Sequence, residues 1–302
     1  MHHRTALALT LIFAIFLSFL GFASSVQAKT SSQTSGVEYD DFILYQDTNG
    51  DTVCRLANAA ERSEIEKNRP RNVRQVNHLA DEFFLKSETS NAEQHLTIIV
   101  RATAALDANA DAKAAFVRAA ANWEAKINSP VTIYLDADLS SDGFGAGTLG
   151  STSSVSNTYS YSFVRNTLLS GANTAQKQNI YNSLPSNSVP TDVNNATNLS
   201  VSGSIARAIG LQNQTAQPTD PAANIRFNST FAFDFDASDG ITGNRTDFEA
   251  VATHEIGHAL GSTWRAGGGG NTTPAMWDLY RFRTGTTAGT FTTATRIMTI
   301  GG

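Results

Sequence analysis

Cysteine is nearly absent from this chain of 302 residues, which contains only Cys54. A single cysteine excludes an intramolecular disulfide, and with it the class of small domains held together by disulfides. Positive charge is also scarce, because the formal net charge is −5 and no run of lysines or arginines occurs. This balance excludes the basic surface that nucleic-acid binding requires, so no nucleic-acid partner is expected.

Long apolar runs are limited to one, from Ala6 to Ala23. It follows the short basic start at 1–4 and precedes Ser25-Val26-Gln27-Ala28, which places small residues before a cleavage point. This order is typical of a secretory signal peptide, predicted over 1–28, with an uncleaved membrane anchor as the alternative. We expect an exported protein, secreted or periplasmic, that makes no membrane contact after cleavage. The sequence does not indicate an oligomeric state.

The charged segment 29–90 is expected to be a leader, a prosegment or an N-terminal helical subdomain. It contains a predicted strand at 39–45 and predicted helices at 57–67 and 73–85. Residues 91–302 are expected to form the main domain. A strand at 95–101, an amphipathic helix at 112–127 and a strand at 131–135 predict a parallel pair with a crossover helix. Further along we expect a loop at 139–160, a helix within 161–184 broken at Gly171, and strands at 225–227 and 231–235.

Two histidines four residues apart enclose a glutamate in His254-Glu255-Ile256-Gly257-His258. Residues at this spacing share one face of a helix, so both imidazoles can hold one zinc ion. Thr246 and Glu249 form a capping-box pattern that predicts where this helix begins. Gly261 stands where a left-handed glycine would end it. Glu255 is the predicted general base acting on zinc-activated water.

A catalytic zinc site needs three protein ligands, and the third is not evident. No histidine follows His258, and the only acidic residue after the motif is Asp278. Asp278 is therefore a candidate ligand, although it would serve equally as a helix cap. Cys54 is either an ordinary small apolar residue or a thiolate that occupies the metal's open position and keeps the enzyme latent. Asp234, Asp236 and Asp239 form either a polar turn or a structural calcium site.

The segment His-Glu-Ile-Gly-His-Ala-Leu-Gly, the strands before it and the helix around Trp123 resemble the metzincin zinc metallopeptidases, especially matrixin-like and secreted bacterial members. This resemblance implies an α+β fold with a twisted mixed sheet, a crossover helix and an active-site helix. It also implies a third ligand at the position of Trp264, which cannot bind zinc. Three explanations stay open: a third histidine beyond Gly302 in a longer chain, Asp278 as the ligand, or a degenerate site. Met276 and Met298 are candidates for the family's methionine turn, or else core residues.

The motif and the resemblance together predict an exported zinc metalloendopeptidase acting on a protein or peptide substrate. His254, His258 and Asp278 are the predicted metal ligands, and Glu255 is the predicted catalytic residue. Two alternatives belong to other classes. One is a catalytically inactive binding protein that has kept the fold without a third ligand, and the other is a zinc amidase acting on cell-wall peptides.

Overall fold

The computed structural model describes residues 38–77, 95–184, 186–189, 197–265 and 273–280. Within these residues the protein is a mixed α+β structure with an eight-stranded mixed sheet and seven α-helices, as expected at the level of fold class. The expected signal peptide at 1–28 lies outside the described residues. No helix in the described part combines the length and the apolar character needed to cross a membrane.

The described residues divide into two compact units. The unit that carries the histidine motif, called the motif unit below, contains 39–155 and 214–261. The second unit contains Glu38, 156–213 and 262–280 with the gaps given above. Residues 39–77, which fall within the segment expected to be a leader, a prosegment or an N-terminal helical subdomain, lie in the motif unit and supply strands to its sheet.

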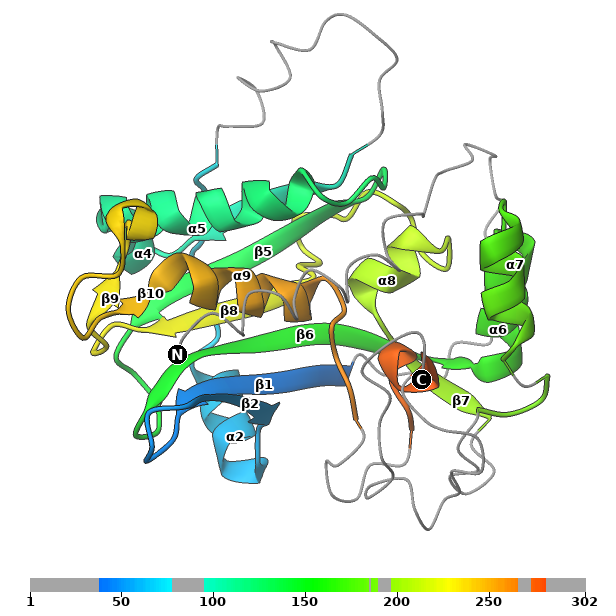
Figure 1. Ribbon diagram of the computed structural model, residues 1–302, viewed down its shortest axis with the longest axis horizontal. Coiled ribbons are helices and arrows are strands. Elements are labelled where there is room, and N and C mark those ends of the chain that lie inside the picture. Colours follow the sequence, from blue (N-terminus) through cyan, green and yellow to red (C-terminus); the bar gives the residue numbers. More distant parts are fainter. Residues whose placement is uncertain (1–37, 78–94, 185, 190–196, 266–272, 281–302) are drawn as a thin grey trace, which may run out of the picture. The chain divides into compact units, whose positions relative to one another are not determined.

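The sheet of the motif unit has the strand order β2-β1-β6-β8-β5-β4-β3. The part from β2 to β5 can be followed in Figure 1. Parallel pairing joins β4 to β5 and β5 to β8, whereas β1–β2, β3–β4 and β6–β8 are antiparallel. The strands are β1 (Glu38–Gln46), β2 (Thr52–Leu56), β3 (Arg74–Gln75), β4 (Thr97–Ala102), β5 (Thr132–Ser140), β6 (Thr148–Ser160) and β8 (Ala223–Asn228). A separate two-stranded parallel pair is formed by β9 (Phe233–Asp234) and β10 (Thr246–Asp247).

The predicted crossover is confirmed, because β4 and β5 are parallel and the helix between them packs on the sheet. That helix, α5 (Ala110–Glu124), lies beside α9 (Phe248–Ala259) in the motif unit (Figure 1). The other helices of this unit are α2 (Ala59–Lys67), α4 (Ala104–Ala108) and the 3-10 turn η2 (Ala237–Asp239). Between sheet and helices lies an apolar core that includes Ile98, Val100, Phe116, Ile133, Leu135, Ile225, Phe227, Phe248 and Ile256.

Two sequence expectations about the sheet were wrong. The segment expected as a loop at 139–160 contains β6, the longest strand, whose serines and threonines are nearly all buried. The pattern was misread because this strand has few large apolar residues, although it lies between β1 and β8. Arg74–Gln75 pair with β4 as β3, where a helix was expected to begin at Val73; residues 78–85 of that expected helix lie outside the described part.

The second unit contains the end of β6, which pairs antiparallel with β7 (Asn198–Ser202). Its helices are α6 (Tyr161–Ser170), α7 (Ala175–Asn182), α8 (Gly203–Ala208) and the 3-10 helix η3 (Met276–Tyr280). The predicted break at Gly171 is confirmed, because α6 ends there. Met276 is buried in this unit's apolar core, in agreement with the interpretation of a core methionine.

Candidate metal centre

The motif helix α9 forms as the sequence predicts, but its cap lies one residue further along. Thr246 pairs with Phe233 in β10, and Asp247 pairs with Asp234 in the same short strand. Asp247 is the N-cap, and its Oδ1 accepts a hydrogen bond from the backbone N–H of Ala250 over 3.0 Å. The helix ends as predicted, since Gly261 follows the C-cap in a left-handed conformation with φ 106°.

Glu249 does not complete the predicted capping box. Its carboxylate instead accepts hydrogen bonds from Arg118 Nε and Asn122 Nδ2, each over 2.9 Å, and both donors belong to α5. The first turn of α9 is thereby joined to the crossover helix. Further along, Trp123 Nε1 donates to the backbone oxygen of Thr253 over 3.0 Å, immediately before the first motif histidine. These contacts fix the helix in place from one side.

Packing against the sheet fixes the helix from the other side. Phe248, at its first turn, is fully buried in an aromatic cluster with Phe227, Phe233 and Phe235, with ring centroids 4.7–5.2 Å apart. Toward α5, Gly257 faces Trp123, and a Cβ built on it would lie 3.4 Å from the indole. The motif residues are therefore presented from a rigid helix.

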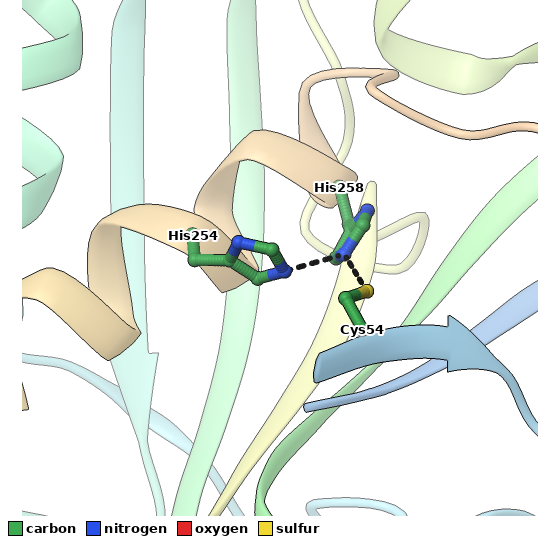
Figure 2. Close-up of side chains that lie close together, drawn as sticks. All are labelled: Cys54, His254 and His258. Atoms are coloured by element: carbon green, nitrogen blue, oxygen red, sulfur yellow. Dashed lines mark hydrogen bonds between the residues drawn. The ribbon is translucent and has the colours of Figure 1, made fainter. Parts of the chain in front are cut away.

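His254 and His258 approach each other on one face of α9, and Cys54 of β2 approaches them from the sheet (Figure 2). The two Nε2 atoms are 3.1 Å apart, and Cys54 Sγ is 3.2 Å from His258 Nε2. One potential ligand atom from each residue lies within 4.8 Å of the others. Among the described residues, this is the only group of three or more histidine, cysteine or acidic side chains so arranged.

The separations within this group suit a zinc ion. Zinc bound tetrahedrally at ~2.05 Å from nitrogen and ~2.3 Å from sulfur sets its ligands about 3.3–3.6 Å apart. The 3.1 and 3.2 Å contacts are slightly shorter than these spacings, and the Cys54–His254 pair lies within 4.8 Å, so the side chains would have to adjust to hold the ion. Imidazole and thiolate donors together are typical of zinc sites.

The surroundings of the group are apolar. Phe42 of β1 stacks on the His258 ring, with centroids 4.3 Å apart and an interplanar angle of 11°. Burial lowers the pKa of His254 to about 4, so its imidazole is neutral at physiological pH and keeps a lone pair for a metal. Burial also raises the pKa of the Cys54 thiol far above its ordinary value, and the negative charge of Glu255 adds to this effect. The thiol therefore holds its proton until a cation replaces it.

Glu255 lies on the sheet side of α9 and is fully buried. The hydroxyl of Thr152, on β6, is 2.5 Å from Glu255 Oε2, whereas no described residue donates a hydrogen bond to Oε1. Burial raises the pKa of Glu255 to about 8, an effect that the Thr152 hydrogen bond opposes. A divalent cation held nearby would lower this pKa again, leaving a carboxylate able to exchange protons near neutral pH.

Asp278, the predicted third ligand, is not part of the Cys54–His254–His258 group. It lies in η3 of the second unit, where its buried Oδ2 accepts hydrogen bonds from the backbone N–H groups of Arg265 and Ala275, each over 3.0 Å. Asp278 is the third residue of η3 and accepts from residues that precede it, so it does not act as the helix cap before Leu279 that the sequence offered as the alternative. Its role as a ligand gains no support from these contacts.

The acidic residues considered for calcium serve the turn around η2. Asp234 accepts from the backbone N–H groups of Asp236 and Thr242, over 3.1 and 2.7 Å. Asp236 in turn accepts from Ser238 over 3.2 Å. These bonds lower the pKa of both Asp234 and Asp236. Asp239 forms the end of the same turn, so the polar-turn interpretation accounts for the cluster without a cation.

Sequence reasoning missed two residues that surround the motif. Thr152 lies in the segment interpreted as a loop, and nothing in that serine- and threonine-rich stretch distinguishes it from its neighbours. Phe42 belongs to the predicted strand at 39–45, but its contact with His258 depends on strand order, which the sequence did not indicate. For Cys54 the sequence offered an ordinary apolar residue or a thiolate that blocks the metal, and its proximity to the motif histidines depends on strand order in the same way.

A scan of the chain against protein-family models matches no family. Searches of curated proteins and of solved structures likewise give no significant match.

Proposed function

We propose that the protein is an exported zinc-dependent metallopeptidase, with His254 and His258 as metal ligands and Glu255 as general base. The observation that carries this proposal is the convergence of the two histidine Nε2 atoms, 3.1 Å apart, on a helix whose intervening glutamate is buried beside them. Export is supported by the sequence at 1–28, and a peptide substrate by the resemblance to metzincins.

The two histidines would hold the ion, and His254 stays neutral under physiological conditions because burial lowers its pKa. A zinc ion held there supplies a Lewis acid that polarises the scissile carbonyl and acidifies a water molecule. The remaining chemistry belongs to the chain. Glu255 accepts the proton from the attacking water and delivers it to the departing amine, since a carboxylate with a raised pKa is suited to both transfers.

The fold around Glu255 keeps one carboxylate oxygen available for this transfer. Thr152 occupies Oε2, which fixes the orientation of the carboxylate, and leaves Oε1 without a hydrogen bond from the described residues. Gly150 lies beside Oε1, and a Cβ built on it would be only 3.2 Å away. The absence of a side chain at position 150 therefore keeps Oε1 uncrowded.

The proposal is tested by Glu255→Gln in the full-length chain, with zinc content and hydrolysis of a casein substrate measured together. Gln keeps the size of the side chain but cannot accept the proton, so zinc should stay at about one per chain while turnover falls by roughly 100-fold or more. His254→Ala should lose both the bound zinc and the hydrolysis of casein. If Glu255→Gln hydrolyses casein as fast as the parent chain, Glu255 is not the base and the proposal fails.

The same preparations separate the alternatives. Hydrolysis of peptidoglycan but not casein, again dependent on Glu255, would identify a cell-wall amidase. Weak or absent zinc, with no hydrolysis of either polymer by the parent chain, would favour the inactive binding protein instead.

A further inference from the structure

We propose that Cys54 is the third protein ligand of the metal held by His254 and His258, in place of the ligand missing after the motif. This inference rests on the proposed function, because it completes the same site. The resemblance to metzincins would place the third ligand at Trp264, which offers no metal-binding atom, and Asp278 accepts hydrogen bonds from backbone N–H groups in the second unit. Among the described residues, the further metal-binding atom beside the two histidines is the sulfur of Cys54 in β2.

The thiol is aimed at the metal position. Cys54 Sγ is 3.2 Å from His258 Nε2, which is itself 3.1 Å from His254 Nε2, and the three residues offer ligand atoms that all lie within 4.8 Å of one another (Figure 2). Two imidazoles and one thiolate leave the fourth position of a tetrahedral ion open, as a catalytic zinc requires. The thiol loses its proton when the metal binds, because the thiolate is the form that coordinates.

The backbone of the β1–β2 hairpin fixes the thiol in this position. Cys54 pairs with Leu44 and Leu56 pairs with Phe42, in antiparallel register. Side chains two residues apart share a face of a strand, so Cys54 and Phe42 lie on the same face of the hairpin. Phe42 stacks on the His258 ring from this face. The β1–β2 hairpin thus supplies the Cys54 sulfur and, through Phe42, also orients the His258 imidazole.

A removable blocking role for Cys54 agrees less well with these contacts. The hairpin is part of the sheet, since β1 lies next to β6 and Gln46 donates its backbone N–H to Gly147 O over 2.9 Å. Phe42, Ile43 and Leu44 are all buried in the core. Withdrawing Cys54 to open the site would expose these side chains and break strand pairing. A sulfur built into the sheet is suited to remain bound through turnover.

The test is cobalt substitution in the full-length chain, with Cys54→Ala and Cys54→Ser as variants. Because the chain has a single cysteine, any sulfur-to-cobalt charge-transfer band reports on Cys54 alone. Val53→Ser is the matched control, since it places the same hydroxyl in β2 on the opposite face of the strand. Circular dichroism of each variant establishes that the sheet is formed, and casein hydrolysis is measured on the zinc forms.

The expected result is one cobalt per chain with a thiolate band in the parent and in Val53→Ser. Cys54→Ala and Cys54→Ser should lose the band, hold zinc at least tenfold more weakly and lose hydrolysis. Stoichiometric cobalt without the band would overturn the assignment of Cys54 while leaving the histidine site intact. A Cys54 variant that keeps zinc and hydrolyses faster would also overturn it, by showing that the thiol blocks the site. No metal on the folded parent chain would instead refute the proposed function itself.

Discussion

Thr152 and Glu255 form a buried contact between β6 and the motif helix, in which the threonine hydroxyl lies 2.5 Å from Glu255 Oε2 and 3.2 Å from the Glu255 backbone oxygen. Both side chains are fully buried. The carboxylate is therefore positioned by the sheet as well as by its own helix. We infer that Thr152 is a positioning residue that acts through Glu255.

Thr152→Val keeps the branched shape and removes the donor, so the carboxylate loses its fixed orientation and its remaining hydrogen bond. We expect kcat to fall by about 10-fold, because one hydrogen bond to a charged group contributes roughly 1.5–3 kcal/mol, while KM and zinc content stay unchanged. The pH profile of kcat should also shift upward, since loss of the bond removes an influence that lowers the Glu255 pKa. Thr152→Ser should restore kcat. An unchanged pH profile in Thr152→Val would argue against a positioning role.

Gly150 lies in the same strand, and its lack of a side chain has a steric reason. A Cβ at this position would lie 3.1 Å from the backbone oxygen of Arg226 and 3.2 Å from Glu255 Oε1. The backbone of β8 cannot easily move, so we expect Gly150→Ala to reduce the free energy of unfolding by about 1–3 kcal/mol and to lower kcat. Gly145→Ala is the control, since its Cβ would lie 3.6 Å from Thr148 Oγ1, an ordinary contact. Equal midpoints of thermal unfolding for the two variants would contradict this expectation.

Sequence reasoning identified the parts of the site that obey a short-range rule. The spacing of His254 and His258 predicts a shared helix face because helix geometry depends on neighbours along the chain. Gly261 predicts the end of that helix for the same reason. The N-cap was misplaced by one residue, because Thr246 and Asp247 are both good cap residues and no local pattern distinguishes them.

The parts that sequence reasoning did not place depend on strand order. Cys54 reaches the histidines because β1 and β2 extend the sheet beyond β6, and no local pattern states that order. Strand β6 itself was missed because buried serines and threonines replace the alternating large apolar residues by which strands are recognised. Thr152 belongs to β6, so it was not predicted as a site residue either. A site shared between one helix and three strands was therefore predicted only on its helical side.

The carboxylate of Glu124 provides a pH-dependent test of the fold away from the metal ligands. Its Oε1 accepts a hydrogen bond from the backbone N–H of Ile98 over 2.6 Å, and burial raises its pKa above the ordinary value of 4.5. Below pH 4.5 the carboxyl is protonated in both the folded and the unfolded chain. Above this pH it ionises more readily in the unfolded chain than in the folded one. Stability is therefore lost as the pH rises through this window.

Glu124→Gln removes the ionisation and keeps an oxygen that can accept from Ile98. We expect the variant and the parent to have similar midpoints of thermal unfolding at pH 4. As the pH rises to 7, the midpoint of the variant should become higher than that of the parent. Thermal unfolding followed by circular dichroism across this range measures the difference. A gap between the two midpoints that is constant with pH would show that ionisation of Glu124 is not responsible.

Removal of the metal should destabilise the protein, because the Cys54–His254–His258 group joins α9 to β2 and exists only in the folded chain. A ligand that binds only the native state stabilises it by about 1.4 kcal/mol for each tenfold excess of free ligand over Kd. Chelation should therefore lower the thermal midpoint of the parent, and added zinc should restore it. His254→Ala should begin near the chelated midpoint and respond to neither treatment. If chelation lowers both midpoints equally, the stabilising ion binds elsewhere in the chain.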